Sequence, residues 1–200
     1  MRIGVVGLQG AVSEHIRITN KAMEQLDLDG EAFWLRRPKQ LGDLEGIIIP
    51  GGESTTIGRL MKNSGIFNRI QEMGKDGMPI FGTCAGLILL AREGDKEVMK
   101  TEQPLLELMN VKITRNAFGR QRESFEVNLD IPAFGETPFK CVFIRAPSIK
   151  EVLGEVEILA EYGDEIVAAR QDNLLALAFH PELTTDTRAH EYFLNMCDSK

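Results

Sequence analysis

The sequence predicts a three-layer α/β fold: an open, mostly parallel sheet with an antiparallel or mixed extension in the second half of the chain. In the first half, short apolar runs alternate with helical segments, which is typical of a doubly wound parallel sheet with right-handed crossovers. In the second half, short apolar runs follow one another with turn residues between them, which favours antiparallel pairing. For 200 residues we expect a single domain spanning residues 1–200.

The strands expected in the first half are apolar runs that end at glycine or proline. The run over residues 2–8 stops at Gln9 and Gly10, at the carboxyl edge where open α/β sheets bind their ligands. The other runs lie at residues 32–35, 46–49 and 79–82. Helical segments are expected at residues 12–26, about 54–63, about 66–75 and from residue 85 onward.

The second half is expected to begin with a solvated loop over the charged residues 92–102. Short strands then follow at residues 111–114, 124–129, 142–144, 156–159, 166–169 and 174–179. A last helix over residues 187–196 would carry Tyr192, Phe193 and Met196 on its inner face.

The composition argues against several partners and locations. A net charge of −7 disfavours nucleic acids and anionic membranes, because both are bound mainly through lysine and arginine. The longest apolar stretch, residues 85–91, is far below the length that crosses a bilayer. The three cysteines are widely spaced and match no disulfide framework, so we expect a reducing cytoplasm. We expect neither a bound metal nor a cofactor.

The central motif is Cys84, at a corner between an apolar strand and an apolar helix. Such a corner lifts a nucleophile above the sheet edge, and the glycines at Gly82 and Gly86 allow close approach of backbone and substrate. The helix start directs N–H groups and the positive end of its dipole at the sulfur, which favours negative charge there. A buried structural cysteine is the alternative, since most free cysteines are of that kind.

A Gly-Gly loop follows the strand at residues 46–49 and consists of Gly51, Gly52, Glu53 and Ser54. Glu53 and Ser54 suit a helix start, so a capped helix is one interpretation. Successive glycines also let main-chain N–H groups face a ligand, as in a backbone oxyanion hole. This loop alone leaves both interpretations open.

His180 and Glu182 stand at the end of the strand at residues 174–179. Because residues two apart in extended chain project to the same side, the Glu182 carboxylate can reach the His180 ring. It would fix the tautomer and stabilise the imidazolium, while the other ring nitrogen takes a proton from a thiol. His15 and His190 lie in helical, polar contexts, where we expect no such partner. A simple turn is the alternative, but the cysteine corner, the Gly-Gly loop and this histidine together favour a cysteine acyl-transfer site.

Residues 115–125 contain several arginines and a glycine. They form either an exposed, solvated loop or a recognition loop for a carboxylate-bearing substrate, because a planar guanidinium suits bidentate pairing. Arg145, after Ile144 at the end of an apolar strand, is a second candidate. Whether it pairs with a substrate or in a structural salt bridge stays open.

The motifs, taken in order, resemble those of the glutaminase subunit of pyridoxal 5′-phosphate synthase, the PdxT-type class I (triad) glutamine amidotransferases. The matching stretches are Gly-Leu-Gln-Gly-Ala-Val from Gly7, Pro-Gly-Gly-Glu-Ser-Thr-Thr from Pro50, Gly-Thr-Cys-Ala-Gly-Leu from Gly82, Arg-Asn-Ala-Phe-Gly-Arg-Gln from Arg115, Phe-Ile-Arg-Ala-Pro from Phe143 and Phe-His-Pro-Glu-Leu from Phe179. The first and fourth point to the vitamin B6 branch. The resemblance covers nearly the whole chain and implies a flavodoxin-like amidotransferase fold.

The resemblance implies that Cys84 is the nucleophile, His180 the general base and acid, and Glu182 its orienting carboxylate. L-glutamine would be hydrolysed to L-glutamate and ammonia through a thioester. Ammonia would pass to a PdxS-type synthase subunit that builds pyridoxal 5′-phosphate. A Gly-Gly peptide that can reorient would keep the activity weak until that subunit docks.

The same resemblance assigns the binding residues. Gly52, Glu53 and Ser54 would contact glutamine, Gly51 and Gly52 would supply oxyanion N–H groups, Arg115, Ile144 and Arg145 would line the pocket, and Gln9 and Gly10 would lie at the face that meets the synthase. Residues 92–107 follow no family motif, and Glu107 falls where relatives often have glycine.

Three other functions fit part of these observations. One is the glutaminase of another class I amidotransferase, such as that of histidine biosynthesis, which would differ in its synthase partner. Another is a non-catalytic protein on the same fold, which loss of a triad residue would favour, and here all three are present. The third is a cysteine hydrolase of the DJ-1/PfpI kind, which a histidine at the end of a late strand disfavours.

Overall fold

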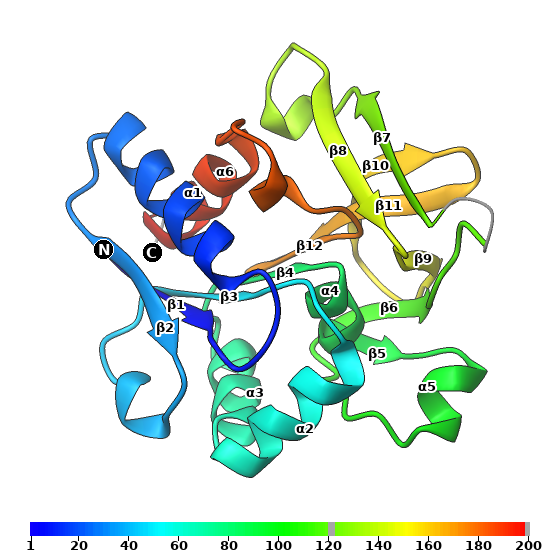
Figure 1. The fold of residues 1–200 in the computed structure, drawn as a ribbon, viewed down its shortest axis with the longest axis horizontal. Coiled ribbons are helices and arrows are strands. Elements are labelled where there is room, and N and C mark those ends of the chain that lie inside the picture. Colours follow the sequence, from blue (N-terminus) through cyan, green and yellow to red (C-terminus); the bar gives the residue numbers. More distant parts are fainter. Residues whose placement is uncertain (120–122, 199–200) are drawn as a thin grey trace.

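The computed structural model describes residues 1–119 and 123–198, and its helices lie on both faces of a central sheet (Figure 1). In this part of the chain, ten strands form one sheet in the order β2-β1-β3-β4-β12-β11-β9-β6-β5, with β10 paired to β11. Its first half is a continuous parallel run of β1 (Arg2–Val6), β2 (Glu31–Leu35), β3 (Gly46–Ile49), β4 (Ile80–Thr83) and β12 (Leu174–Leu177). This order confirms the predicted flavodoxin-like half.

The rest of the sheet is the predicted mixed extension. Its strands are β5 (Ala91–Glu93), β6 (Met109–Thr114), β9 (Ser148–Val152), β10 (Glu157–Tyr162) and β11 (Glu165–Gln171). β11 pairs antiparallel with β12, β10 and β9, whereas β5 and β6 are parallel. A second, two-stranded sheet joins β7 (Ser124–Leu129) to β8 (Phe139–Ile144).

Two groups of helices cover the parallel strands (Figure 1). One face carries α1 (Val12–Gln25) and α6 (Arg188–Asp198), and the other carries α2 (Ser54–Ser64), α3 (Phe67–Lys75) and α4 (Ala85–Leu90). α5 (Lys96–Lys100) lies at the β5 edge. Among the helices described, none has the length and apolar character needed to cross a membrane.

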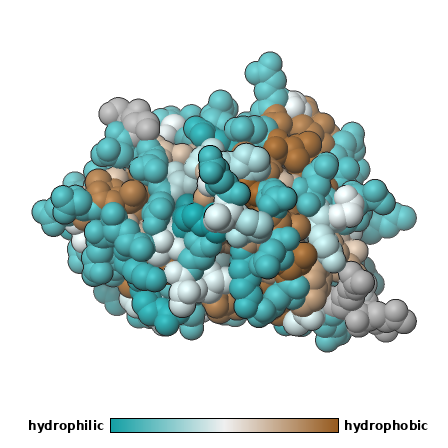
Figure 2. Space-filling model, turned by 90° about the horizontal axis from the view of Figure 1, so that it is seen from above, coloured by the Kyte–Doolittle hydropathy of each residue, from teal (hydrophilic) through white to brown (hydrophobic). Residues whose placement is uncertain are grey.

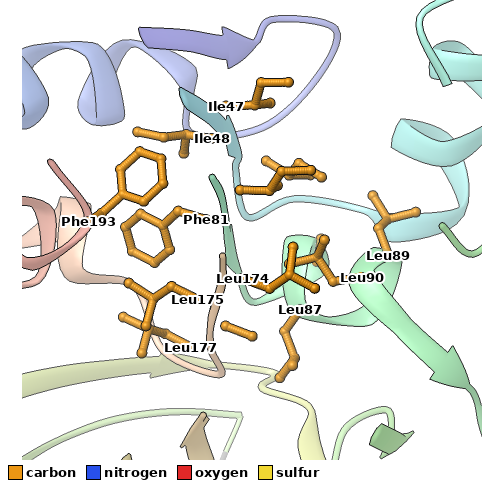
Figure 3. Close-up of a cluster of buried hydrophobic side chains, with 14 of the residues drawn as sticks. Ile47, Ile48, Phe81, Leu87, Leu89, Leu90, Leu174, Leu175, Leu177 and Phe193 are labelled. Atoms are coloured by element: carbon orange, nitrogen blue, oxygen red, sulfur yellow. The ribbon is translucent and has the colours of Figure 1, made fainter. Parts of the chain in front are cut away.

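The core fixes the positions of the strand ends by filling both faces of the parallel sheet (Figure 3). Phe81 of β4 packs against Phe193 of α6, with their ring centroids 5.4 Å apart. On the opposite face, Leu90 of α4 lies over Leu174 of β12. All four side chains are nearly or fully buried, and such burial is worth about 1.5–3 kcal/mol for each. The outer surface differs: the face in Figure 2 is mostly hydrophilic, with apolar residues gathered in separate areas.

The stretch over residues 92–102 is not simply the solvated loop that its charges predict, because it contains part of β5 and the whole of α5. The Asp95 side chain accepts hydrogen bonds from the backbone N–H groups of Glu97 and Val98, which caps α5. Val98 is 3% exposed and anchors the helix. One buried valine among charged residues is a weak periodic signal, so the element was missed. The strand β9 was missed as well.

Glu107 has a φ of 54°, which explains why a glycine suits this position. We expect Glu107→Gly to raise the free energy of unfolding by about 0.5 kcal/mol. Left-handed backbone costs a non-glycine residue roughly 1 kcal/mol, and the greater freedom of glycine in the unfolded chain cancels part of that gain. Urea unfolding measures the difference. The matched control is Glu136→Gly, at an exposed loop glutamate outside the left-handed region, which should destabilise. Equal effects of the two substitutions would contradict this account.

Candidate active site

The candidate site lies where three neighbouring parallel strands end. β4 pairs with β3 on one side and with β12 on the other, so their carboxyl ends lie side by side. Gly51 follows β3, Cys84 follows β4 and His180 comes shortly after β12. The topology thus brings together three motifs that are far apart in the sequence.

Cys84 is held in a strained corner at the start of α4. Its φ of 48° and ψ of −99° are unusual for a residue with a side chain and cost about 1–3 kcal/mol. The surrounding packing maintains this conformation: the Cys84 N–H donates to the Leu177 carbonyl at 2.8 Å. A Cβ on Gly86 would lie 2.1 Å from the Ile49 oxygen, and one on Gly82 would lie 2.6 Å from the Gly86 carbonyl carbon. Larger residues at either glycine would therefore push α4 off the sheet.

His180 is paired with Glu182 in the way that the His-Pro-Glu spacing suggests. The distance from His180 Nδ1 to Glu182 Oε1 is 2.7 Å, and the Glu182 side chain is fully buried. Burial alone would lower the pKa of His180, but hydrogen bonds to Cys84 and Glu182 and the charges of both raise it to about 10. Burial would raise the pKa of Glu182, but the electrostatic interaction with His15, followed by the hydrogen bond and charge of His180, lowers it. At neutral pH this pair is an imidazolium and a carboxylate.

The Gly-Gly loop lies directly against these side chains. A Cβ on Gly51 would lie 2.3 Å from His180 Cε1 and 3.4 Å from Cys84 Cβ. The Gly51 carbonyl accepts the Ala11 N–H at 3.1 Å, and the Gln9 side-chain oxygen accepts the Glu53 N–H at 2.8 Å. The loop after β1 therefore fixes the direction of the peptide that follows Gly51.

A cavity of about 280 Å³ opens in front of Cys84 and His180. Its lining includes all the predicted binding residues: Gly52, Glu53, Ser54, Arg115, Ile144 and Arg145, together with Gln9, Ile88 and Asn116. Gly10 and Gly51 belong to the loops beside it, and Glu182 lies buried behind His180. Within residues 1–119 and 123–198, no group of three or more His, Cys, Asp or Glu side chains could hold a metal ion.

Glu53 does what the capped-helix interpretation requires and also faces the cavity. Its carboxylate accepts the backbone N–H groups of Thr55 at 3.2 Å and Thr56 at 2.7 Å. Burial would raise the pKa of Glu53, but hydrogen bonds from Thr56 and Thr55 lower it. Arg115 Nη2 lies 3.6 Å from Glu53 Oε1, so a structural ion pair is present at this arginine.

Gln103 is a pocket-supporting residue that sequence reasoning missed. It is 6% exposed, and its side-chain oxygen accepts hydrogen bonds from Ser54 Oγ at 3.0 Å and Thr55 Oγ1 at 3.1 Å. Arg115 Nη1 lies 3.4 Å from the same oxygen. Gln103 follows α5 in a stretch without periodicity or motif, so no sequence signal could have found it. Of the predicted recognition loop, residues 120–122 lie outside the described residues.

The expectation that His15 has no carboxylate partner is wrong. His15 Nε2 lies 3.4 Å from Glu182 Oε2 and 3.0 Å from Thr83 Oγ1, and His15 Nδ1 lies 3.0 Å from His190 Nε2. Both His15 and His190 are fully buried, and this burial lowers the pKa of each below its ordinary value. The prediction counted only apolar residues as the buried face of each helix. In the structure α1 and α6 pack against each other and bury these polar residues as well.

Comparison with known proteins agrees with this geometry. The chain matches the SNO glutamine amidotransferase family over residues 5–199. It is 55% identical over 195 residues to the pyridoxal 5′-phosphate synthase subunit PdxT of Thermococcus onnurineus, covering 97% of this chain and 98% of that one. It is also 55% identical over 197 residues to the subunit of the same name from Pyrococcus horikoshii, with the same coverage. A crystal structure of a glutamine amidotransferase superposes with a TM-score of 0.87 at 43% identity, covering 98% of each chain.

The buried histidines predict how stability depends on pH. The pKa values of His15 and His190 are lowered in the folded chain, so below about pH 6.5 the unfolded chain binds more protons and stability falls as the pH decreases. The pKa of His180 is raised to about 10, so its contribution is fully present below about pH 6.5 and is lost as the pH rises toward 10. Urea unfolding between pH 5 and 9 should show that the histidine-dependent part is largest near pH 6.5.

The variant His190→Phe isolates the acid side of this dependence. It removes one histidine whose pKa is lowered, so the loss of stability below pH 6.5 should become shallower by up to about 1.4 kcal/mol per pH unit. The alkaline side, which depends on His180, should keep its slope. An acid-side slope equal to that of the unmodified chain would show that His190 is not held neutral.

Proposed function

This chain belongs to the SNO glutamine amidotransferase family, and we propose that the cavity at the ends of β3, β4 and β12 is its glutaminase site. The enzyme hydrolyses L-glutamine to L-glutamate and ammonia, and it supplies the ammonia for pyridoxal 5′-phosphate synthesis. One observation carries the assignment: the side chains of Cys84 and His180 line one cavity, and Glu182 holds the far side of the His180 ring at 2.7 Å.

The reaction begins with His180 as an imidazolium, which holds the single proton that it shares with Cys84, and the Cys84 sulfur attacks the side-chain amide carbon of glutamine. Main-chain N–H groups of the Gly51–Gly52 loop and of the start of α4 hold the oxyanion. His180 donates its proton to the nitrogen, ammonia leaves, and a thioester remains on Cys84. A water molecule, deprotonated by His180, then attacks the thioester carbon and releases glutamate.

Glutamine recognition requires groups for its amino and carboxylate ends. The Glu53 carboxylate is partly exposed at the cavity, and its lowered pKa keeps it ionised, so it suits the ammonium group. The guanidinium groups of Arg115 and Arg145 suit the carboxylate by charge and by their fork-shaped geometry. These assignments place the amide of glutamine toward Cys84.

The partner is a synthase subunit that uses the ammonia, as the names of the relatives from Thermococcus and Pyrococcus indicate for those proteins. We place its docking face beside Gln9 and Gly10. Gln9 lines the cavity and its side-chain oxygen accepts the Glu53 N–H. The Ala11 N–H donates to the Gly51 carbonyl. A partner that displaces this loop would therefore also displace the Gly51–Gly52 peptide. We also place the enzyme in the cytoplasm, in keeping with thiols at Cys84 and Cys141.

Replacing the nucleophile tests the assignment directly. Cys84→Ala should lower glutamate release by about a thousandfold or more, since a covalent step has no substitute, while circular dichroism shows an unchanged fold. The matched control is Cys141→Ala, because Cys141 is a buried thiol whose pKa burial raises to about 12. That control should keep the rate of the unmodified enzyme. Substantial activity in the Cys84 variant would remove Cys84 from its role.

Adding the partner tests the proposed regulation and pathway. Mixing the enzyme with a pyridoxal 5′-phosphate synthase subunit should raise its glutaminase rate about tenfold, which is within the usual range of coupling between sites. Coenzyme formation should then depend on glutamine. The synthase of histidine biosynthesis is the negative control. An unchanged rate with the first synthase, or activation by the second, would overturn the choice of partner.

A further inference from the structure

A chain of buried polar groups continues behind the proposed triad. From the cavity inward it runs through His180 and Glu182 to His15 of α1 and ends at His190 of α6. The three contacts measure 2.7, 3.4 and 3.0 Å, and the last three side chains are fully buried. Glutamine hydrolysis as described above uses neither His15 nor His190.

The outer oxygen of Glu182, Oε2, indicates the role of this row of buried polar groups. Glu182 Oε2 accepts no hydrogen bond of good geometry from the described residues, although it is fully buried. An ionised carboxylate oxygen without a donor is costly in such a place. His15 Nε2 lies 3.0 Å from Thr83 Oγ1 and 3.4 Å from Glu182 Oε2, so a hydrogen on this nitrogen is shared between the two oxygens. The alternative tautomer would set a nitrogen lone pair against a carboxylate lone pair, which is repulsive.

The other end of the chain agrees with the same tautomer. With the hydrogen of His15 on Nε2, its Nδ1 is an acceptor, and His190 Nε2–H donates to it at 3.0 Å. His190 Nδ1, which has no hydrogen-bond partner among the described residues, is then an unprotonated acceptor. In the opposite arrangement it would be a buried N–H donor without a partner, which is rarer in proteins. All donors then point toward Glu182.

We propose that His15 is a positioning residue of the glutaminase site: its Nε2–H holds the outer oxygen of Glu182, and His190 keeps His15 in the tautomer that can do so. This inference rests on the proposed function of the Cys84 site. Glu182 is then held from both sides, by His180 on Oε1 and by His15 on Oε2. Its orientation, and the fraction that stays ionised, depend on both histidines.

Few other charged groups act at this place. Glu14 acts on His15 by its charge, from the same helix. β8 also packs against the turn that carries Glu182. On β8, Lys140 is exposed and pairs with Glu126 at 2.6 Å, and the pKa of Cys141 is raised to about 12, so its thiol is uncharged. On α1 and β8, only His15 therefore presents a titratable group directly to the Glu182 carboxylate.

The first test needs no catalysis. The chain contains three histidines, so ¹⁵N-histidine labelling gives three ring patterns, which the variants His15→Gln, His180→Asn and His190→Phe assign. At pH 7 the proposal requires His15 and His190 to be neutral Nε2–H tautomers and His180 to be an imidazolium. Detection of His15 as an Nδ1–H tautomer or as an imidazolium would overturn the proposal, whatever the enzyme does.

The second test measures the pH profile of kcat for the complex with the synthase subunit. His15→Leu removes the donor to Glu182, so kcat should fall about tenfold and its acid limb should move up by about one pH unit. KM for glutamine should change by less than about threefold, because His15 does not line the cavity. His15→Gln keeps an N–H group and should recover most of the loss.

The control is Thr19→Val, one turn further along α1. Thr19 is fully buried, and its hydroxyl has no hydrogen-bond partner among the described residues, so this variant should keep the pH profile of the unmodified enzyme. A fall of kcat in His15→Leu that is equal at every pH would overturn the positioning role. If the unmodified complex releases no glutamate, the proposed function fails, and the tautomer measurement still decides the role of His15. If His15→Leu does not fold, the tautomer measurement on the unmodified chain still decides the role of His15.

Discussion

The site depends on one steric constraint, the close approach of α4 to β3 and β4. The Ile49 carbonyl lies where a side chain on residue 86 would begin, and residue 82 faces the backbone of residue 86. Only glycine at both positions lets α4 start directly above the sheet with Cys84 in left-handed backbone. The core of Figure 3 supplies the energy that holds this strain, since Leu87, Leu89 and Leu90 are fully buried, with Leu90 against β4 and Leu89 against α2. The position of Cys84 relative to the Gly51–Gly52 loop and His180 therefore depends on this close packing of α4 on the sheet.

A second constraint is electrostatic and acts behind the first. Glu182 is ionised although fully buried, and it stays so because two imidazole rings face its two oxygens. One ring is a cation and the other is neutral. A buried carboxylate with a cation on both sides would carry excess positive charge, and one with neither would take up a proton. With one charged and one neutral ring, the positive charge of His180 balances the negative charge of Glu182. The proton on His180 is then available at the cavity.

Sequence reasoning located the motifs well, because each motif is a local pattern. Glycines around Cys84, a proline after His180 and apolar runs before both are readable without knowledge of the fold. The doubly wound parallel half could be inferred because short apolar runs alternate there with helical segments. The misses have a different origin. Val98 in α5 and Gln103 after it are single buried residues in a charged stretch, and His15 and His190 become neighbours only when α1 packs on α6. Contacts between distant helices leave no trace in periodicity.

The contrast between the buried residues around His180 and the loop outside the core also bears on where a partner protein could regulate the proposed activity. With the pKa of His180 near 10, the proton needed by the leaving nitrogen is already on the ring at neutral pH. The interactions that raise this pKa come from Cys84 and Glu182, so we expect the protonation of His180 not to depend on a partner protein. The Gly51–Gly52 peptide, to which we assign the oxyanion, differs, since it is fixed by Gln9 and Ala11 in a loop outside the core. A docking partner can move that loop at little cost, whereas repacking α1 against α6 would disturb the core. We therefore expect a partner to regulate the proposed site through the Gly51–Gly52 peptide rather than through Cys84, His180 and Glu182.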